Sequence, residues 1–296
     1  EENYVPNPAA RALGTKRTQV IGIVIPDTIK NILDTENSHY YSALLQGITE
    51  EAHLRDFATL LWVGHESEDK GVYHRRILKS QLMDGVLVVS SVVGEEQLLR
   101  QLNDNKKPWV LIGRPLQYAE TVNYVGIDNV AASEQAVEYL LSTGRKRVGT
   151  ITGTMDNIDS EERLQGYKQA FAAANLPVDP DLIVEGCFSR ECGYAGMNVL
   201  LERGVDAVFA ASDLIASGAL QAIQDSGRRV PDDVALVGFD DQPIATRLKP
   251  ALTTVRQSVT EKAAQATAVL LNLIEGRIEP PVQILLPTQL VIRESS

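Results

Sequence analysis

Short apolar runs alternate with amphipathic segments of ten to twenty residues along most of the chain, and the same order restarts near Arg145. This alternation is typical of α/β proteins, in which helices cover a buried parallel sheet. The first half has predicted strands over 19–26, 57–63, 84–90 and 108–112 and helices over 40–55, 69–82 and 94–104. The second half has predicted strands over 147–152, 206–212 and 234–240 and helices over 160–174, 190–202 and 213–226.

The two halves of the chain follow one plan. The stretch "DGVLVVS", which begins at Asp84, is echoed by "DAVFAAS", which begins at Asp206. Gly47 lies 37 residues before the first stretch, and Gly166 lies 40 residues before the second. Matched order and spacing predict an α/β protein with two doubly wound parallel-sheet lobes and a cleft between them. A length of 296 residues with 44% hydrophobic content also favours two medium-sized cores over one.

Residues that directly follow the predicted strands are the first candidates for ligand binding. In open α/β sheets a ligand lies beyond the carboxyl ends of the strands. Polar residues at these positions are Asp27, Ser90, Ser91, Asp128, Ser212, Asp213, Asp240 and Asp241.

Charge separates the first eighteen residues from the rest of the chain. The formal net charge is -11, yet residues 7–18 contain Arg11, Lys16 and Arg17 and no acidic side chain. The remaining residues carry 25 basic and 37 acidic side chains, so they repel a phosphate backbone. Any contact with nucleic acid is therefore expected at the amino end.

The two cysteines and the hydropathy pattern bear on the compartment. Cys187 and Cys192 are five residues apart, without a CxxC spacing or a nearby histidine pair, so we expect reduced thiols and no metal site. No apolar run approaches eighteen residues, and no export leader precedes the first strand. These features predict a cytoplasmic protein with no membrane contact.

Sequence signatures of enzymes are missing from the chain. It contains no GxxxxGK[ST] motif, no GxGxxG after a strand and no GxSxG elbow. Asp240 and Asp241 are adjacent at a strand end, so their side chains point to opposite faces and cannot act together on one bond. We therefore expect neither an enzyme nor a bound cofactor.

Recognisable motifs are spread over the whole chain. They include "NYVPNPAARALGTKRTQVIGIVIPD" (3–27), "YYSALLQGI" (40–48), "VGIDNVAA" (125–132), "TGRKRVGTITG" (143–153), "ERLQGY" (162–167), "FSRECGY" (188–194), "ASDLIASGAL" (211–220), "VPDDVALVGFDD" (230–241) and "PALTTVRQ" (250–257). In the same order, these motifs resemble those of the lactose/galactose-repressor family of bacterial transcription regulators. The resemblance implies a periplasmic-binding-protein-like (type I) fold and a homodimer.

The resemblance also implies how the chain is divided, because the family chain crosses between its lobes three times. Residues 1–18 would be the remnant of a helix-turn-helix headpiece and its hinge helix. The amino-terminal lobe would comprise 19–144 and 255–284, and the carboxyl-terminal lobe would comprise 145–254 and 285–296.

The basic amino-terminal segment resembles the family's hinge helix. Asn7 can cap a helix, Pro8 suits its first turn and Gly14 can end it. About six residues are too few for a stable isolated helix, so the segment should fray when free. In the family, paired hinge helices insert a leucine into the minor groove of operator DNA. Leu13 matches that leucine, and Ala9 and Ala10 lie on the same predicted helix.

Effector-binding residues follow from the same resemblance. Arg163 and Asp240 match the family's effector-binding arginine and aspartate, and charged groups of this kind suit vicinal hydroxyls. Phe188 matches an aromatic residue that stacks on the effector. Ser212 departs from the asparagine that many members carry. The other expected contacts are Asp213, Tyr40, Tyr41, Asp27, Asp128 and Gln257.

The predicted function is the effector-binding and dimerisation core of a transcription regulator, a repressor controlled by a small sugar or polyol. A purine is a second effector class, because it could stack on Phe188, Tyr40 and Tyr41. The alternative function is a solute-binding protein of a transport system, which shares the fold. The hinge-like segment and the missing export signal favour the regulator. The stretch 28–39 is longer than the family's usual loop, and no family contact applies to it.

Overall fold

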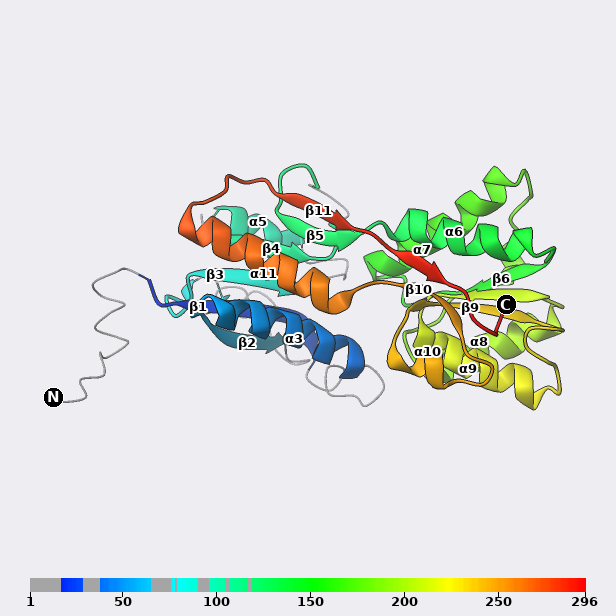
Figure 1. Cartoon of the computed structure of the whole chain (residues 1–296). Helices are drawn as coiled ribbons and strands as arrows, with labels where there is room; N and C mark the ends of the chain where they lie inside the picture. Colours follow the sequence, from blue (N-terminus) through cyan, green and yellow to red (C-terminus); the bar gives the residue numbers. More distant parts are fainter. Residues whose placement is uncertain are drawn as a thin grey trace. The chain divides into compact units, whose positions relative to one another are not determined.

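A computed structural model of the chain describes residues 17–28, 38–64, 76–77, 79–89, 96–104, 107–115 and 119–296. They form two compact units, each built on a six-stranded sheet with flanking helices (Figure 1). Unit 1 takes in nearly all the described residues up to Gly126 and the segment Val259–Ile284, and unit 2 takes in Ile127–Ser258 and Leu285–Ser296. Two mostly parallel sheets covered by helices confirm the predicted fold class.

Unit 1 has the strand order β11-β5-β4-β3-β1-β2, and neighbouring strands from β5 to β2 are parallel. The strands are β1 (Val20–Thr28), β2 (Ala58–Gly64), β3 (Gly85–Val89), β4 (Trp109–Ile112), β5 (Tyr124–Ile127) and β11 (Gln283–Leu286). The helices are α3 (Ser38–Leu54), α5 (Glu96–Asp104) and α11 (Val259–Glu275).

Alternation along β3 gives unit 1 two covered faces. Val86 and Val88 pack in one cluster with Leu98 of α5. Gly85 points the other way, because a Cβ at this position would meet the side chains of Leu270 and Ile274 on α11. Successive residues of a strand alternate between the faces, so a β3 that is buried throughout needs a helix on each side.

Unit 2 repeats this plan with the order β12-β10-β9-β8-β6-β7. Only β12 is antiparallel to its neighbour. The strands are β6 (Val148–Ile151), β7 (Ile183–Val184), β8 (Ala207–Ala210), β9 (Ala235–Asp240), β10 (Thr253–Arg256) and β12 (Gln289–Val291). The helices are α6 (Asn129–Ser142), α7 (Ile158–Ala173), α8 (Arg190–Glu202), α9 (Asp213–Asp225) and α10 (Pro243–Arg247).

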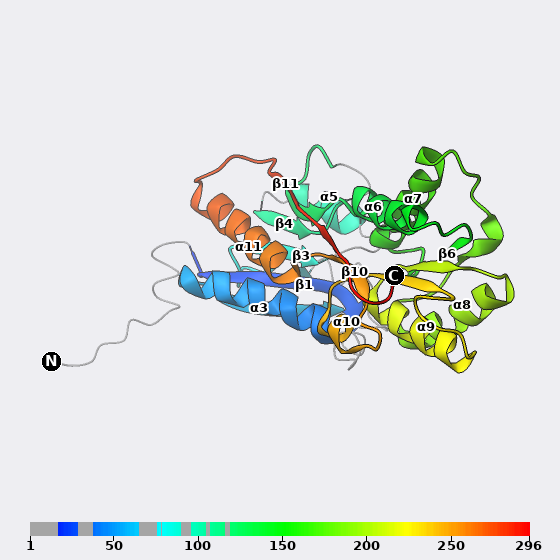
Figure 2. The ribbon, with the colours of Figure 1, turned by 45° about the vertical axis from the view of Figure 1, so that its right-hand side comes forward.

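Helices of unit 2 cover its sheet in two pairs. Val208 and Ala210 of β8 pack with side chains of α8 and α9. Ala207 and Phe209, one residue out of phase, pack with α6 and α7. Within this unit, Figures 1 and 2 both show α6 and α7 on one side of the strands and α8 and α9 on the other. The sheet is therefore buried on both faces, as a parallel sheet requires.

The strand order of unit 2 creates a point where the chain turns to opposite faces. Strand β6 lies between β7 and β8. The chain leaves β6 toward α7 on one face and leaves β8 toward α9 on the other. Such a switch point opens a crevice at the carboxyl ends of the strands, where doubly wound proteins bind their ligands.

The boundaries between the units differ from the predicted ones at two places. The first lies after Gly126, not after residue 144, because α6 packs on unit 2: Ala136 and Leu140 share a cluster with Tyr167 and Phe171 of α7. The second lies after Ser258, not after residue 254, because β10 pairs with β9 and β12 of unit 2.

The prediction of reduced cysteines is wrong. Cys187 and Cys192 form a disulfide with a Cα–Cα distance of 5.6 Å. Ser189 between them caps α8, and its Oγ accepts the Cys192 backbone N–H at 3.2 Å. The first turn of the helix therefore curls Cys192 back toward Cys187, which a count of the intervening residues does not reveal.

Some predictions fall outside the described residues. They concern the hinge residues Ala9, Ala10 and Leu13 and nearly all of the stretch 28–39. Among the described residues, no helix combines the length and the apolar character that crossing a membrane requires. The predicted cleft between the lobes stays a prediction.

Candidate functional site

Polar side chains gather at the carboxyl edge of the unit 2 sheet, beside its switch point. Asp240 ends β9 and Gln257 follows β10 directly. Arg163 reaches the same edge from the second turn of α7, the helix that follows β6. We call this group, together with Asn129, the edge network.

Arg163 is the buried cation of the edge network. Its side chain is 4% exposed and lies over the ring of Phe239, with Cζ 3.7 Å from the ring centroid. Its Nε donates to Asn129 Oδ1 at 3.0 Å, and its Nη1 donates to the carbonyl of Ala211 at 2.6 Å. These contacts fix the guanidinium plane, so the group is pre-organised for a ligand.

Asp240 is the buried anion of the network. Its Oδ1 lies 3.6 Å from Arg163 Nη1 and accepts from Gln257 Nε2 at 2.6 Å. Its Oδ2 accepts from Gln242 Nε2 at 3.3 Å. The backbone has φ 109°, which L-residues rarely adopt. A backbone conformation of this kind persists only where the surrounding contacts hold it in place. Residues with such a conformation cluster at ligand sites.

Asn129 is a member of the network that was not predicted from the sequence. It is 1% exposed, and its Nδ2 donates to Asp159 Oδ1 at 2.9 Å and to Glu162 Oε2 at 3.0 Å. The sequence motif pointed to Asp128, one residue earlier. Asp128 instead caps α6 by accepting the Ala131 N–H at 3.0 Å. Taking both residues after β5 as candidates would have included Asn129.

Asp213 lies at the same edge but is shielded from solvent. Its Oδ1 accepts the Thr254 hydroxyl at 2.5 Å, and its Oδ2 accepts the Gln242 backbone N–H at 2.6 Å. Burial, and then the charge of Asp240, raise the pKa of this carboxyl well above its ordinary value. With both oxygens engaged, Asp213 positions Gln242 and the loop after β9.

Phe188 stands between β7 and α8, where it forms an apolar wall. Its ring lies directly against Gly153, so close that a Cβ on Gly153 would collide with Phe188 Cζ. Ser160 is buried beside it, and its Oγ has no hydrogen-bond partner among the described residues. Phe188 is partly exposed, as an aromatic that stacks on a ligand must be.

Other predicted residues belong to unit 1, whereas the edge network belongs to unit 2. Tyr40 and Tyr41 lie on α3 of unit 1, where their rings meet edge to face at 5.5 Å, and Lys262 Nζ lies 5.7 Å from the Tyr40 ring. Asp27 lies in β1 of unit 1, and its side chain is outside the described residues.

Asp241 turns away from Asp240. Its oxygens pair with Arg256 Nε and Arg293 Nη2, both at 2.6 Å. The two adjacent carboxylates therefore have different partners, in agreement with the expectation that their side chains point in different directions. Asp241 instead holds β10 and the carboxyl-terminal segment together.

A metal site and a depression in unit 1 are the alternatives to the edge network among the described residues. No group of three or more histidine, cysteine or acidic side chains among them could hold a metal ion. A depression in unit 1, lined by Gln19, His53, Asp56, Phe57 and Ala58, lies at the amino ends of β1 and β2, whereas ligands of such sheets lie beyond the carboxyl ends.

A fixed cation, a carboxylate, two amides and an aromatic wall can recognise a small polar ligand. The charged groups give strong hydrogen bonds in defined directions, and Phe188 offers an apolar face. The network itself contains no serine, cysteine or histidine that could act as a nucleophile.

Comparison with known proteins agrees with this fold. Residues 137–296 match the family described as "Periplasmic binding protein-like domain". The chain is 38% identical to the HTH-type transcriptional regulator CelR of Thermobifida fusca, over 100% of this chain and 86% of the relative. It is 30% identical to the HTH-type transcriptional regulator DegA of Bacillus subtilis (strain 168), with the same coverage.

Solved structures give the same assignment. A "transcriptional regulator CelR-cellobiose complex" superposes with a TM-score of 0.86 at 34% identity, over 100% of this chain and 93% of that one. A LacI-family regulatory protein from Chloroflexus aggregans gives 0.80 at 30% identity, over 94% and 98%. These relatives confirm the predictions of a ligand-controlled regulator and of no enzyme activity, and they speak against a transport protein. The chain belongs to the LacI family of transcription regulators.

Proposed function

We propose that the edge network of unit 2 binds a neutral sugar, and that this sugar controls a repressor. The observation that carries the proposal is the buried pair of Arg163 and Asp240, held by Asn129 and Gln257 beside the wall of Phe188. Vicinal hydroxyls can accept from the guanidinium and donate to the carboxylate, and the apolar face of a sugar ring can lie on Phe188.

The charge of the chain favours a neutral ligand over an anionic one. The formal net charge is -11, and the carboxylate of Asp240 lies within the edge network. A sugar supplies hydroxyl donors to a carboxylate without adding negative charge. A purine is the second effector class to test, because its ring could stack on Phe188.

The CelR–cellobiose complex supports a sugar and favours glucose-based disaccharides as first candidates. The sequence predicted a monosaccharide or polyol as the effector. Disaccharides and these smaller ligands should therefore be tested together. We further propose a homodimer that acts in the cytoplasm. It would contact operator DNA through a headpiece and through a hinge helix that contains Ala9, Ala10 and Leu13. Tyr40, Tyr41, Asp27 and Asp128 stay secondary candidates for effector contact.

Thermal shift and calorimetry with the 296-residue chain test the sugar. The panel contains cellobiose, glucose, glucose 6-phosphate, glycerol, guanine and hypoxanthine. We expect cellobiose or glucose to raise the melting temperature, because a ligand of the folded state stabilises it by mass action. Arg163→Ala and Asp240→Asn should each weaken binding by about 1 to 3 kcal/mol, since each leaves a buried partner unsatisfied.

Arg229→Ala is the matched control. Arg229 also pairs with carboxylates, Asp232 and Asp233, but its side chain is 70% exposed, so its loss should leave sugar affinity unchanged. Stabilisation by nucleobases alone would reject the sugar. Equal sugar affinity in Arg163→Ala and wild type would reject the site.

A further inference from the structure

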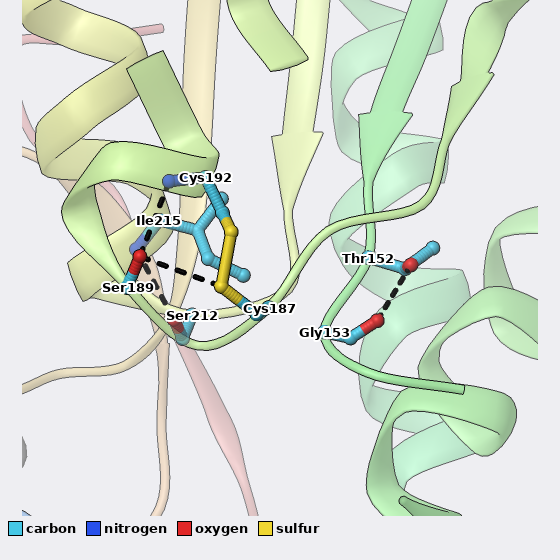
Figure 3. Close-up of a disulfide and its surroundings, with 7 residues drawn as sticks. All are labelled: Thr152, Gly153, Cys187, Ser189, Cys192, Ser212 and Ile215. Atoms are coloured by element: carbon cyan, nitrogen blue, oxygen red, sulfur yellow. Dashed lines mark hydrogen bonds between the residues drawn. A yellow bond between two sulfur atoms is a disulfide. The ribbon is translucent and has the colours of Figure 1, made fainter. Parts of the chain in front are cut away.

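The Cys187–Cys192 disulfide lies in the wall of the proposed effector site. Phe188 and Ser189 lie between the two cysteines in the sequence, inside the loop that the disulfide closes. Cys192 lies in the first turn of α8 (Figure 3). The segment before the loop runs along the end of β6: Thr152 N–H donates to the carbonyl of Val184 at 3.0 Å. A Cβ at Gly186 would lie 2.8 Å from the carbonyl oxygen of Thr152.

Ser189 joins the cap of α8 to the disulfide. Its Oγ accepts the Cys192 backbone N–H at 3.2 Å and lies 3.4 Å from Cys187 Sγ. In the disulfide neither sulfur carries a proton, so the hydroxyl is the donor toward the sulfur. Figure 3 shows these two contacts converging on Ser189. The disulfide and the cap together fix the backbone on both sides of Phe188.

We propose that this disulfide is a reversible redox site that sets effector affinity through Phe188. The inference rests on the proposed function. A regulator that acts in the cytoplasm meets cellular dithiols, which can reduce a disulfide. Cys187 and Cys192 are both partly exposed, so a reductant can reach the bond. The two cysteines flank Phe188, so a change in their redox state can change how Phe188 is held beside the edge network.

The chemical step is thiol–disulfide exchange with a dithiol reductant. A thiolate of the reductant attacks Cys187 Sγ, the Sγ–Sγ bond breaks, and Cys192 leaves as a thiolate. Cys192 is the better leaving group, because the N–H groups in the first turn of α8 favour a thiolate. The second thiolate of the reductant then releases Cys187. The protein gains two electrons and two protons, and the dithiol becomes a disulfide.

Reduction should act on the Phe188 loop and leave the helices in place. α8 is held against α9 through Gly193 and Gly218, where each glycine meets the backbone of the other helix. The residues that directly precede α8, Phe188 and Ser189, are instead held by the disulfide, by the Ser189 cap and by the packing of the Phe188 ring against Gly153. The reduced loop therefore gains freedom, and ligand binding must then order Phe188 again. This ordering should weaken sugar binding by about three- to tenfold.

The test compares oxidised and reduced forms of the 296-residue chain. Thiol titration establishes the redox state, calorimetry with cellobiose gives the dissociation constant, and amide hydrogen exchange follows residues 186–192. In the reduced wild type we expect two thiols, about three- to tenfold weaker cellobiose binding and faster exchange in that segment alone. Cys187→Ser combined with Cys192→Ser should match the reduced wild type and ignore the reductant.

The readouts keep the two proposals separate. If cellobiose binds neither form, the sugar proposal loses its support, and amide exchange in 186–192 still decides the redox inference. Two released thiols with unchanged exchange and unchanged affinity would overturn it. It also fails if oxidising conditions form no disulfide, or if the double serine variant responds to reductant as wild type does. The wild-type comparison does not depend on the folding of any variant.

Discussion

Asp213 is a carboxyl group wholly shielded from solvent, and this shapes its chemistry. Its oxygens accept from the Thr254 hydroxyl and from the Gln242 backbone, yet burial and the charge of Asp240 still raise its pKa well above 3.8. The proton is therefore retained in the folded state at pH values where the unfolded state has lost it. Folding stability must depend on pH through this residue.

Replacement of Asp213 by asparagine tests this linkage. Below about pH 3.8 both states hold the proton, and the residue adds no pH dependence. Above it the unfolded state releases its proton first, so the free energy of unfolding of wild type falls by up to about 1.4 kcal/mol per pH unit. The stability of Asp213→Asn relative to wild type should thus rise as the pH increases above about 4, for as long as the folded wild type keeps the proton. Urea unfolding at each pH measures the free energies of unfolding of both proteins. A difference between them that stays constant with pH would contradict the prediction.

Single residues of the site were predictable to different degrees. Arg163 and Asp240 were predicted from motifs, and the structure brings them together with Gln257. Asn129 was missed because its role depends on a long-range partner, Arg163, 34 residues away. Periodicity and spacing carry no information about which buried donor meets which acceptor.

At the scale of elements, close backbone packing between α8 and α9 supports the site. Gly193 of α8 faces the carbonyl oxygen of Ile215, and Gly218 of α9 faces that of Arg190. Neither position has room for a Cβ, so the two helices meet along their glycines. This contact sets where the amino end of α8 lies and thereby where the Phe188 loop begins.

Gly193→Ala should therefore destabilise the protein strongly. The methyl group would collide with backbone, which cannot move aside as a side chain does, so we expect a loss of about 2 to 3 kcal/mol relative to Gly196→Ala. Gly196 is the matched control on the same helix. A methyl group added there would have Ile151 Cγ2 as its nearest neighbour, at 3.1 Å, and alanine also favours the helix. Thermal and urea unfolding compare the two variants, and equal stabilities would show that α8 and α9 can separate at little cost.

Elements were recovered well where their apolar pattern was strong. The predicted strand over 84–90 corresponds to β3 at Gly85–Val89, and the predicted helix over 190–202 is α8. Helix α6 was not among the predicted elements, and its residues were assigned to the amino-terminal lobe through the predicted boundary at 144. The structure packs this helix on unit 2, and the sequence does not show on which sheet a helix packs. The disulfide was missed for a similar reason: the helical cap, not the spacing, brings the cysteines together.

For the molecule as a whole, charge limits what the chain can bind. The formal net charge is -11, and the residues after position 18 carry 25 basic against 37 acidic side chains. Nonspecific DNA binding depends on cations that displace counterions from phosphates. The dissociation constant of the chain alone for duplex DNA should therefore exceed roughly 0.1 mM at physiological salt, the value typical of weak nonspecific complexes.

A fusion protein tests the proposed route from sugar to DNA. We would join the helix-turn-helix region of the relative CelR ahead of Glu1, because residues 1–18 resemble the hinge segment that follows the headpiece in this family. The fusion should bind CelR operator DNA with a steep salt dependence, because phosphate contacts supply most of the affinity. A sugar that binds the edge network should change the operator affinity by about five- to 150-fold, the usual range of coupling between two sites.

Asp240→Asn within the fusion separates coupling from DNA binding. Asp240 lies at the sheet edge of unit 2, far along the chain from the fused region, so the variant should keep operator affinity and salt dependence. It should lose the response to sugar, because the carboxylate that accepts from hydroxyls is gone. Gel shifts at two salt concentrations, each with and without sugar, measure both properties. A sugar response that survives in Asp240→Asn would mean that the effector acts through residues other than the edge network.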